Sequence, residues 1–128
     1  MMGFKVIGSD ISEKLLRFSK VNLDYYNIRD YELKVWDATK LPENMKFDAI
    51  VCDPPYGRTV KVKGDLSELY VKFMKSAYSP MKKNSRLVMI CPKSLKVLKL
   101  NKWFKVDSVN EWFIHGSLTR QIIVFIKQ

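Results

Sequence analysis

The tetrapeptide Asp53-Pro54-Pro55-Tyr56 carries the residue types needed to activate a poor nucleophile. The exocyclic amine of a nucleobase reacts slowly because its lone pair is delocalised into the ring. The Asp53 carboxylate and the Pro54 carbonyl can accept its two N–H bonds and draw the lone pair out of the ring plane. The prolines hold that carbonyl rigidly, and Tyr56 offers a face on which a base can stack. The alternative is a turn stiffened by prolines.

Two more aspartates stand where predicted strands end. A carboxylate at Asp10 can accept both hydroxyls of a ribose, as in dinucleotide-binding folds. A carboxylate at Asp37 can accept the exocyclic amine of an adenine. Each has a structural alternative, which is a turn that leads into a helix for Asp10 and a simple Asp-Ala-Thr turn for Asp37. With Asp53, they predict a nucleoside-binding edge of a sheet.

Hydrophobic periodicity predicts the elements that position these residues. Strands are expected at residues 4–8, 33–36, 47–52, 86–91, 104–114 and 120–126, and helices at 12–26, 65–78 and 94–100. Pro80 and Asn84 predict a turn before the fourth strand. The alternation predicts an α/β fold with a mostly parallel, doubly wound sheet and an antiparallel pair at its C-terminal end. Ligands bind such sheets at the carboxyl ends of the strands.

Composition limits the classes of protein that fit. With 128 residues, 47% of them hydrophobic, the chain is expected to be one ordered unit. Residues 1–57 carry 8 basic and 9 acidic side chains, net −1, whereas residues 58–128 carry 15 and 4, net +11. That asymmetry predicts a surface that faces a polyanion such as RNA, or else a solvated lysine-rich surface. Cys52 and Cys91 are expected to be buried thiols, and no signal peptide or membrane span is recognised, which predicts a cytoplasmic protein.

The motif resembles that of a known family. Asp53-Pro54-Pro55-Tyr56 is similar to the catalytic motif of S-adenosylmethionine-dependent amino-methyltransferases, and Gly8-Ser9-Asp10 and Asp37 resemble their ribose-binding and adenine-binding positions. Residues 53–58 and 115–120 resemble a narrower group, the archaeal and eukaryotic tRNA guanine-N2 methyltransferases that carry an RNA-binding THUMP domain. Over nearly the whole chain, the resemblance implies a Rossmann-like class I methyltransferase sheet.

The resemblance also implies a cofactor, a substrate and their binding residues. S-adenosylmethionine would be bound by Asp10, Ile11, Asp37, Ala38 and Asp53, and catalysis would use Asp53, Pro54, Pro55 and Tyr56. RNA, most simply tRNA, would contact Gly57, Arg58, Lys61, Lys63 and Arg120. Arg120 has the alternative role of binding a carboxylate within the fold, and no metal is expected.

The family pattern includes a segment that this sequence does not show. The catalytic domain of the family begins with a strand, a Gly-rich turn and a helix, and no GxG turn occurs in the 128 residues. We therefore expect residues 1–128 to be a partial catalytic domain without that turn or the THUMP domain, and a weak cofactor binder alone. The absent strand would lie between the strands at 4–8 and 47–52. This predicts direct pairing of those strands, self-association, or a partner chain that supplies the strand.

Three alternatives remain open from the residues alone. The same chemistry would serve adenine-N6 methylation of DNA or rRNA. A non-catalytic RNA-binding remnant or subunit would bind RNA in a salt-sensitive way because of the basic half. A dehydrogenase is a weaker alternative, since no GxGxxG turn accompanies Asp10.

Overall fold

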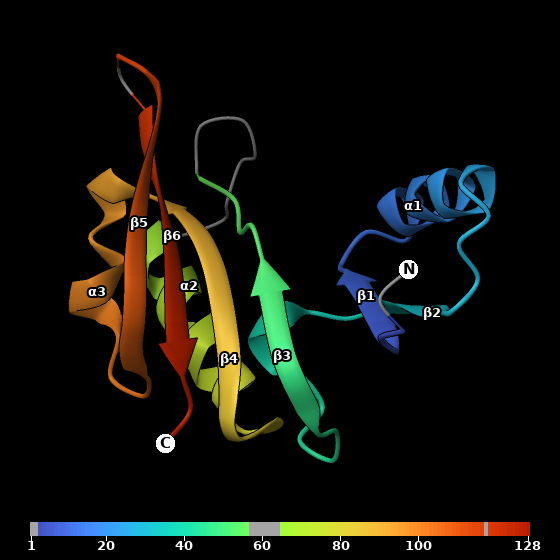
Figure 1. The fold of residues 1–128 in the computed structure, drawn as a ribbon, viewed down its shortest axis with the longest axis horizontal. Coiled ribbons are helices and arrows are strands. Elements are labelled where there is room, and N and C mark those ends of the chain that lie inside the picture. The colour runs from blue at the N-terminus through green and yellow to red at the C-terminus, as the bar shows by residue number, and fades with distance from the viewer. Residues whose placement is uncertain (1–2, 57–64, 117) are drawn as a thin grey trace. The chain divides into compact units, whose positions relative to one another are not determined.

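The structure is a computed structural model that describes residues 3–56, 65–116 and 118–128. The chain divides into two compact units, Met1–Leu41 and Pro42–Gln128. Strands and helices alternate in each of them (Figure 1).

The first unit contains two parallel strands and a helix. Strand β1 (Val6–Asp10) leads into α1 (Glu13–Tyr25), and β2 (Tyr31–Val35) is followed by a 3₁₀ turn (Ala38–Lys40). The parallel register pairs Val6 with Tyr31 and Asp10 with Val35. Ser12 caps α1, because its hydroxyl accepts the Leu15 N–H at 3.4 Å.

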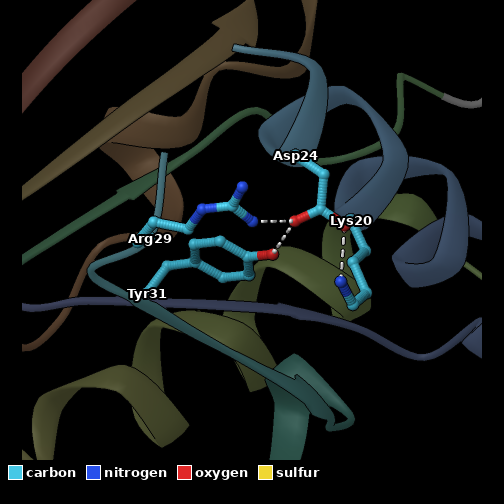
Figure 2. Close-up of polar contacts among 4 residues, drawn as sticks. All are labelled: Lys20, Asp24, Arg29 and Tyr31. Atoms are coloured by element: carbon cyan, nitrogen blue, oxygen red, sulfur yellow. Dashed lines mark hydrogen bonds and ion pairs between the residues drawn. The ribbon is translucent and has the colours of Figure 1, made fainter. Parts of the chain in front are cut away.

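A polar cluster around Asp24 joins the end of α1 to the start of β2 (Figure 2). The Asp24 carboxylate accepts hydrogen bonds from Lys20 at 2.5 Å, Arg29 at 3.1 Å and the Tyr31 hydroxyl at 3.4 Å. The hydrogen bond from Lys20 is the largest cause of the lowered pKa of Asp24. The cluster is exposed, so we assign it a role in fixing the helix-to-strand connection and little stability.

The second unit contains a mixed sheet of four strands. Its elements are β3 (Phe47–Cys52), α2 (Leu66–Tyr78), β4 (Met81–Pro92), a 3₁₀ turn (Lys93–Leu95), α3 (Val97–Leu100), β5 (Lys105–His115) and β6 (Leu118–Ile126). The strand order is β3-β4-β6-β5. β3 runs parallel to β4, whereas β6 is antiparallel to both β4 and β5. The predicted combination of parallel strands and an antiparallel C-terminal pair is therefore confirmed.

The core of the second unit lies between α2 and one face of this sheet (Figure 1). One face of α2 buries Tyr70, Phe73, Met74 and Ala77, which recur at helical spacing. The sheet contributes alternate residues of its two central strands, namely Leu87, Met89, Cys91, Ile123 and Phe125. This packing fixes β4 and β6, the strands that support the candidate site.

The strands predicted at 4–8, 33–36 and 120–126 are observed within two residues of those bounds, as β1, β2 and β6, and two larger differences lie in the second unit. β4 begins at Met81, whereas the sequence predicted a turn through Asn84 and a strand from Arg86. Asn84 has a φ of 63°, so the turn-forming residue is accommodated as an irregularity within the strand. The helix predicted at 94–100 is divided at Lys96, whose φ is 54° and which separates the 3₁₀ turn from α3.

Each unit has a strand that is paired on one side only within the described residues. β1 pairs with β2, and β3 pairs with β4. Val6 in β1 is 52% exposed and Val51 in β3 is 72% exposed, although both belong to apolar runs. Exposed apolar strand edges of this kind are sites at which another strand can add.

Lys127 connects the end of the chain to the end of α2. Its ammonium donates to the carbonyls of Tyr78 at 2.7 Å, Met81 at 2.7 Å and Ser79 at 3.4 Å. A cation is favourable there because the last carbonyls of a helix lack partners within it.

Substituting Lys127 should therefore destabilise the second unit. We expect Lys127→Met to lower the free energy of opening by about 1–3 kcal/mol, because it leaves carbonyl groups without a donor. Hydrogen exchange of the β6 amides, followed by mass spectrometry, measures this. Lys105→Met, at an exposed position, is the control. An equal effect of both substitutions would contradict the capping role.

Candidate active site

The motif stands at the carboxyl end of β3, as predicted. Asp53 follows the last strand residue, Cys52, and is exposed, while Tyr56 is half-buried. The Tyr56 hydroxyl donates a short hydrogen bond to Oδ1 of Asp53. No described residue donates to Oδ2 of Asp53 in the second unit. The carboxylate is thus oriented by Tyr56, and the described residues leave its second oxygen available as an acceptor.

A buried tyrosine outside the motif also supports it. The buried Tyr70 of α2 donates its hydroxyl to the Pro55 carbonyl at 3.4 Å. The apolar spacing of a helix favours burial of Tyr70 but does not show what its hydroxyl contacts. The only signal was its chemistry, since a buried tyrosine hydroxyl usually finds a hydrogen-bond partner.

The environment keeps the nearby tyrosine and thiol groups protonated. Burial, and then the hydrogen bond to Asp53, raise the pKa of Tyr56 well above its ordinary value. Burial raises the pKa of Cys52 to about 12 and that of Cys91 to about 11. Both cysteines are free thiols. At neutral pH the Tyr56 hydroxyl is therefore a donor, and neither thiol is a nucleophile.

A cavity of about 350 Å³ lies beside Tyr56. It is lined by Tyr56, Leu66, Pro92, Ser94, Leu95, His115, Leu118 and Arg120. Its volume is in the range of small-ligand pockets, roughly 300–1,000 Å³. The sequence analysis did not include the leucines, Pro92 or Ser94 in the site, because no motif marks them.

The predicted substrate-binding residues divide into two groups. Arg120 lies in β6, and its guanidinium carbon is 5.1 Å from the centroid of the Tyr56 ring, over the ring. Gly57, Arg58, Lys61 and Lys63 lie outside the described residues. The structure therefore brings Asp53, Tyr56 and Arg120 together.

The other two aspartates lie at neighbouring strand ends of the first unit. Asp10 ends β1, and its Oδ1 accepts the Ser12 N–H at 2.7 Å. Asp37 follows β2 and accepts the N–H and the hydroxyl of Thr39 at 2.9 and 2.7 Å. The Trp36 N–H donates to the Asp10 carbonyl at 3.2 Å, which holds the two ends together.

These contacts match the turns that were the structural alternatives for Asp10 and Asp37. Each carboxylate can still accept further hydrogen bonds, because these contacts use only its Oδ1 atom. Ile11 is 73% exposed beside Asp10, and Ala38 is exposed beside Asp37. The predicted cofactor residues of this unit therefore present two carboxylates and an apolar side chain, which suits the hydroxyls, amine and ring of an adenosine.

Thr39 should control the titration of Asp37. Its hydroxyl and N–H lower the pKa of the Asp37 carboxyl. We expect Thr39→Val to raise that pKa toward the ordinary value near ~3.9. The stability that the depressed pKa supplies is present above the ordinary value and is lost as pH falls through the lowered one.

Carbon-13 NMR of the Asp37 carboxyl across acidic pH measures this shift. Thr39→Ser keeps a hydroxyl and should leave the pKa low. An identical titration curve in the valine variant would show that the hydroxyl has no such influence.

Comparison with known proteins connects this geometry to a family. Residues 2–122 match a family described as RMKL-like, methyltransferase domain. The chain belongs to this family. It is 35% identical over 129 residues to the tRNA (guanine(10)-N2)-dimethyltransferase of Pyrococcus abyssi (strain GE5 / Orsay), a match that covers 97% of this chain and 39% of that protein.

Other relatives agree with this assignment. The chain is 33% identical over 134 residues to a probable tRNA (guanine(10)-N2)-dimethyltransferase of Methanothermococcus thermolithotrophicus, covering 98% of this chain and 77% of that protein. The crystal structure of TrmN from Thermus thermophilus superimposes with a TM-score of 0.79 at 20% identity, covering 95% of this chain and 36% of that one. The methyltransferase fold is thereby confirmed, and the chain spans well under half of the P. abyssi relative.

Membrane-spanning helices and metal-binding clusters are both absent from the described residues. None of their helices is both long and apolar enough to cross a bilayer. No group of three or more metal-ligating side chains occurs among them.

Proposed function

We propose that this chain contributes the catalytic motif to an S-adenosylmethionine-dependent methylation of guanine N2 in tRNA, within a larger or completed enzyme. The observation that carries the proposal is the exposed Asp53 carboxylate, oriented by Tyr56 at a strand end beside a cavity. The family membership and the names of the relatives support it.

Asp53 and Pro54 hold the reacting amine in this mechanism. Oδ2 of Asp53 and the Pro54 carbonyl accept its two N–H bonds, while Tyr56 stacks the base. The lone pair is then directed out of the ring plane, and orientation and electrostatics supply the acceleration. S-adenosylmethionine, when bound, supplies an electrophilic methyl group. The amine loses a proton after attack, when it has become acidic, so no strong general base is needed.

The first unit would hold the adenosine part of the cofactor. Asp10 would accept the ribose hydroxyls and Asp37 the adenine amine, with Ile11 and Ala38 beside the ring. Asp53 would border the methyl-donating end. The donor set fits, because Asp10 and Asp37 are held at adjacent strand ends with acceptor capacity remaining. Calorimetric titration that gave equal affinity for the cofactor in the native chain and in Asp10→Ala would reject this assignment.

The RNA would be held by the basic half of the chain. Arg120 is placed beside Tyr56, and Gly57, Arg58, Lys61 and Lys63 follow the motif directly in sequence. The net charge of +11 over residues 58–128 supports a polyanionic substrate. We propose a cytoplasmic location, where tRNA is available.

Residues 1–128 would be one part of a catalytic domain that a further strand completes. Among the described residues of its own unit, β1 pairs only with β2 and β3 only with β4, and the match to 39% of the P. abyssi relative supports this part of the proposal. The added strand would come from a partner chain or from self-association. Light scattering across a concentration series identifies self-association, and co-purification with a peptide from the remainder of the P. abyssi relative identifies complementation. A monomer that binds no such peptide would reject both.

The activity is tested in a chimera. The matching region of the P. abyssi relative is replaced by this chain, and methyl transfer to unmodified tRNA, rRNA and DNA is followed with a labelled methyl donor. Nucleoside mass spectrometry should find methylated guanine N2 in tRNA only. Methylation of adenine N6 would favour the alternative substrate class, and RNA binding without transfer would favour a non-catalytic role.

A further inference from the structure

Arg120 occupies a position that its expected roles do not explain. It lies in β6 opposite Pro92 of β4 and Trp112 of β5, and its side chain lines the cavity beside Tyr56. Its guanidinium carbon lies 5.1 Å from the centroid of the Tyr56 ring, over that ring. An arginine held there faces whatever stacks on Tyr56.

The guanidinium has a donor that the fold does not use. Among the described residues, Nε of Arg120 is a buried side-chain nitrogen without a hydrogen-bond partner. No ion pair joins Arg120 to a carboxylate within the described part of the chain, so the alternative of an internal carboxylate partner is not realised there. A buried donor without a partner costs free energy, and a ligand that accepts from it recovers that cost.

The lining of the cavity favours a base over a phosphate as that ligand. Four of the eight lining residues are apolar, namely Leu66, Pro92, Leu95 and Leu118, while Ser94 and His115 add polar groups and Arg120 is the one arginine or lysine among the eight. A phosphate in this cavity would lose its hydration, and the guanidinium of Arg120 would be the one permanent positive charge to offset that cost. A base would bury its apolar ring faces and could direct its polar edge toward Arg120.

Stacking geometry decides which part of the base Arg120 meets. Because the guanidinium already stands over the Tyr56 ring, a base on that face is displaced toward the hydroxyl end of the ring, and the guanidinium meets its edge. The amine edge is assigned to Asp53, at the hydroxyl end of the Tyr56 ring. The other edge of guanine carries O6 and N7, two acceptors that match the arginine fork, whereas adenine presents a donor there.

We propose that Arg120 selects guanine by donating to O6 and N7 while Asp53 holds N2. This inference rests on the proposed function, because it takes the orientation of the base from the role of Asp53. It names a specificity residue that is far from the motif in sequence.

Nucleoside binding by the chain tests the proposal without a cofactor or a phosphate. Saturation-transfer NMR would compare guanosine, inosine, 7-deazaguanosine and adenosine. Guanosine and inosine, which both keep O6 and N7, should bind at least roughly tenfold more tightly than adenosine. 7-Deazaguanosine, which lacks N7, should bind more weakly than guanosine. Ribose 5-phosphate should not compete.

Arg120→Gln provides a reversal, since glutamine pairs with the N6 and N7 of adenine. Adenosine should then bind better than guanosine. Arg86→Gln, which changes an exposed arginine of β4, should keep the guanosine preference. Hydrogen exchange of β6 checks that the Arg120 variant is folded. If the variant is not folded, the comparison of nucleosides with the native chain alone tests the role of Arg120.

The outcomes separate this inference from the proposed function. Equal binding of guanosine and adenosine by the native chain, an unchanged preference in Arg120→Gln, or competition by ribose 5-phosphate would overturn the role of Arg120. Guanosine preference with no methyl transfer by the chimera would uphold the base contact and reject the activity. If a chimera that carries Arg120→Gln methylated guanine with native selectivity, the proposed activity would be upheld and the role of Arg120 would be rejected.

Discussion

Substituting Asp53 by alanine should reduce methyl transfer by the chimera by about 10²–10³-fold, the size found when one preorganised group at a reacting centre is removed. The reason is geometric. Oδ1 of Asp53 is held by the Tyr56 hydroxyl, which leaves Oδ2 to accept from the amine. Without it, the Pro54 carbonyl alone holds the amine, and the lone pair stays delocalised in the ring. Single-turnover transfer of a labelled methyl group to tRNA measures the loss.

Two further variants make this result specific. Asp48→Ala removes another carboxylate of β3, which is exposed and paired with Lys82 at 2.6 Å, and should leave the rate unchanged. Asp53→Asn keeps an acceptor oxygen and should fall between the native and alanine rates. Affinity for tRNA should hold in both Asp53 variants. A rate for Asp53→Ala within a factor of three of the native one, or the same loss in Asp48→Ala, would remove the basis of the proposed mechanism.

Truncating Phe125 should have the largest effect on stability. Phe125 is completely buried in β6, and its ring centroid lies 5.9 Å from that of Phe104. Phe125→Ala should lower the free energy of unfolding of the second unit by about 3–5 kcal/mol, because it loses transfer free energy and leaves a cavity between α2 and the sheet. That is a large part of a total of about 5–15 kcal/mol for a domain.

Hydrogen exchange of β4 and β6 peptides measures the change in this unit separately from the first. Phe113→Ala is the matched control, since Phe113 in β5 is 66% exposed. It should change the free energy by less than about 1 kcal/mol. A small effect at Phe125 would mean that the packing of α2 against the sheet does not determine the stability of this unit.

The elements near the motif could be predicted well from the sequence. β3 was predicted with its observed bounds, because an apolar run followed by two prolines fixes both its burial and its end. The observed caps also obey a local rule, since Ser12 at α1 and Asp65 at α2 each accept a backbone N–H of the first turn. These features depend on residues only a few positions apart.

The boundaries that were wrong have a common cause. Asn84 and Lys96 both adopt a positive φ. The sequence pattern predicted a turn at Asn84, and at Lys96 it gave no sign of an interruption. At Asn84 the strand continues because backbone hydrogen bonds join this part of β4 to Lys127, with the Asn84 N–H donating to the Lys127 carbonyl at 2.8 Å and the Lys127 N–H donating to the Ser85 carbonyl at 3.0 Å. At Lys96 the backbone divides a helix whose apolar spacing was continuous. Tertiary pairing and packing override local preference in such places.

The sequence by itself determined the reactive motif and its place at the end of a strand, because covalent geometry and proline constraints act between neighbours. It also indicated the families of fold and chemistry that the comparisons then supported. Only the tertiary structure decided that Arg120 lies over Tyr56, that Tyr70 holds Pro55, and that the leucines of α2, the 3₁₀ turn and β6 line one cavity. Those residues are far apart in the chain, and they meet because strand register and the packing of α2 against the sheet bring them together.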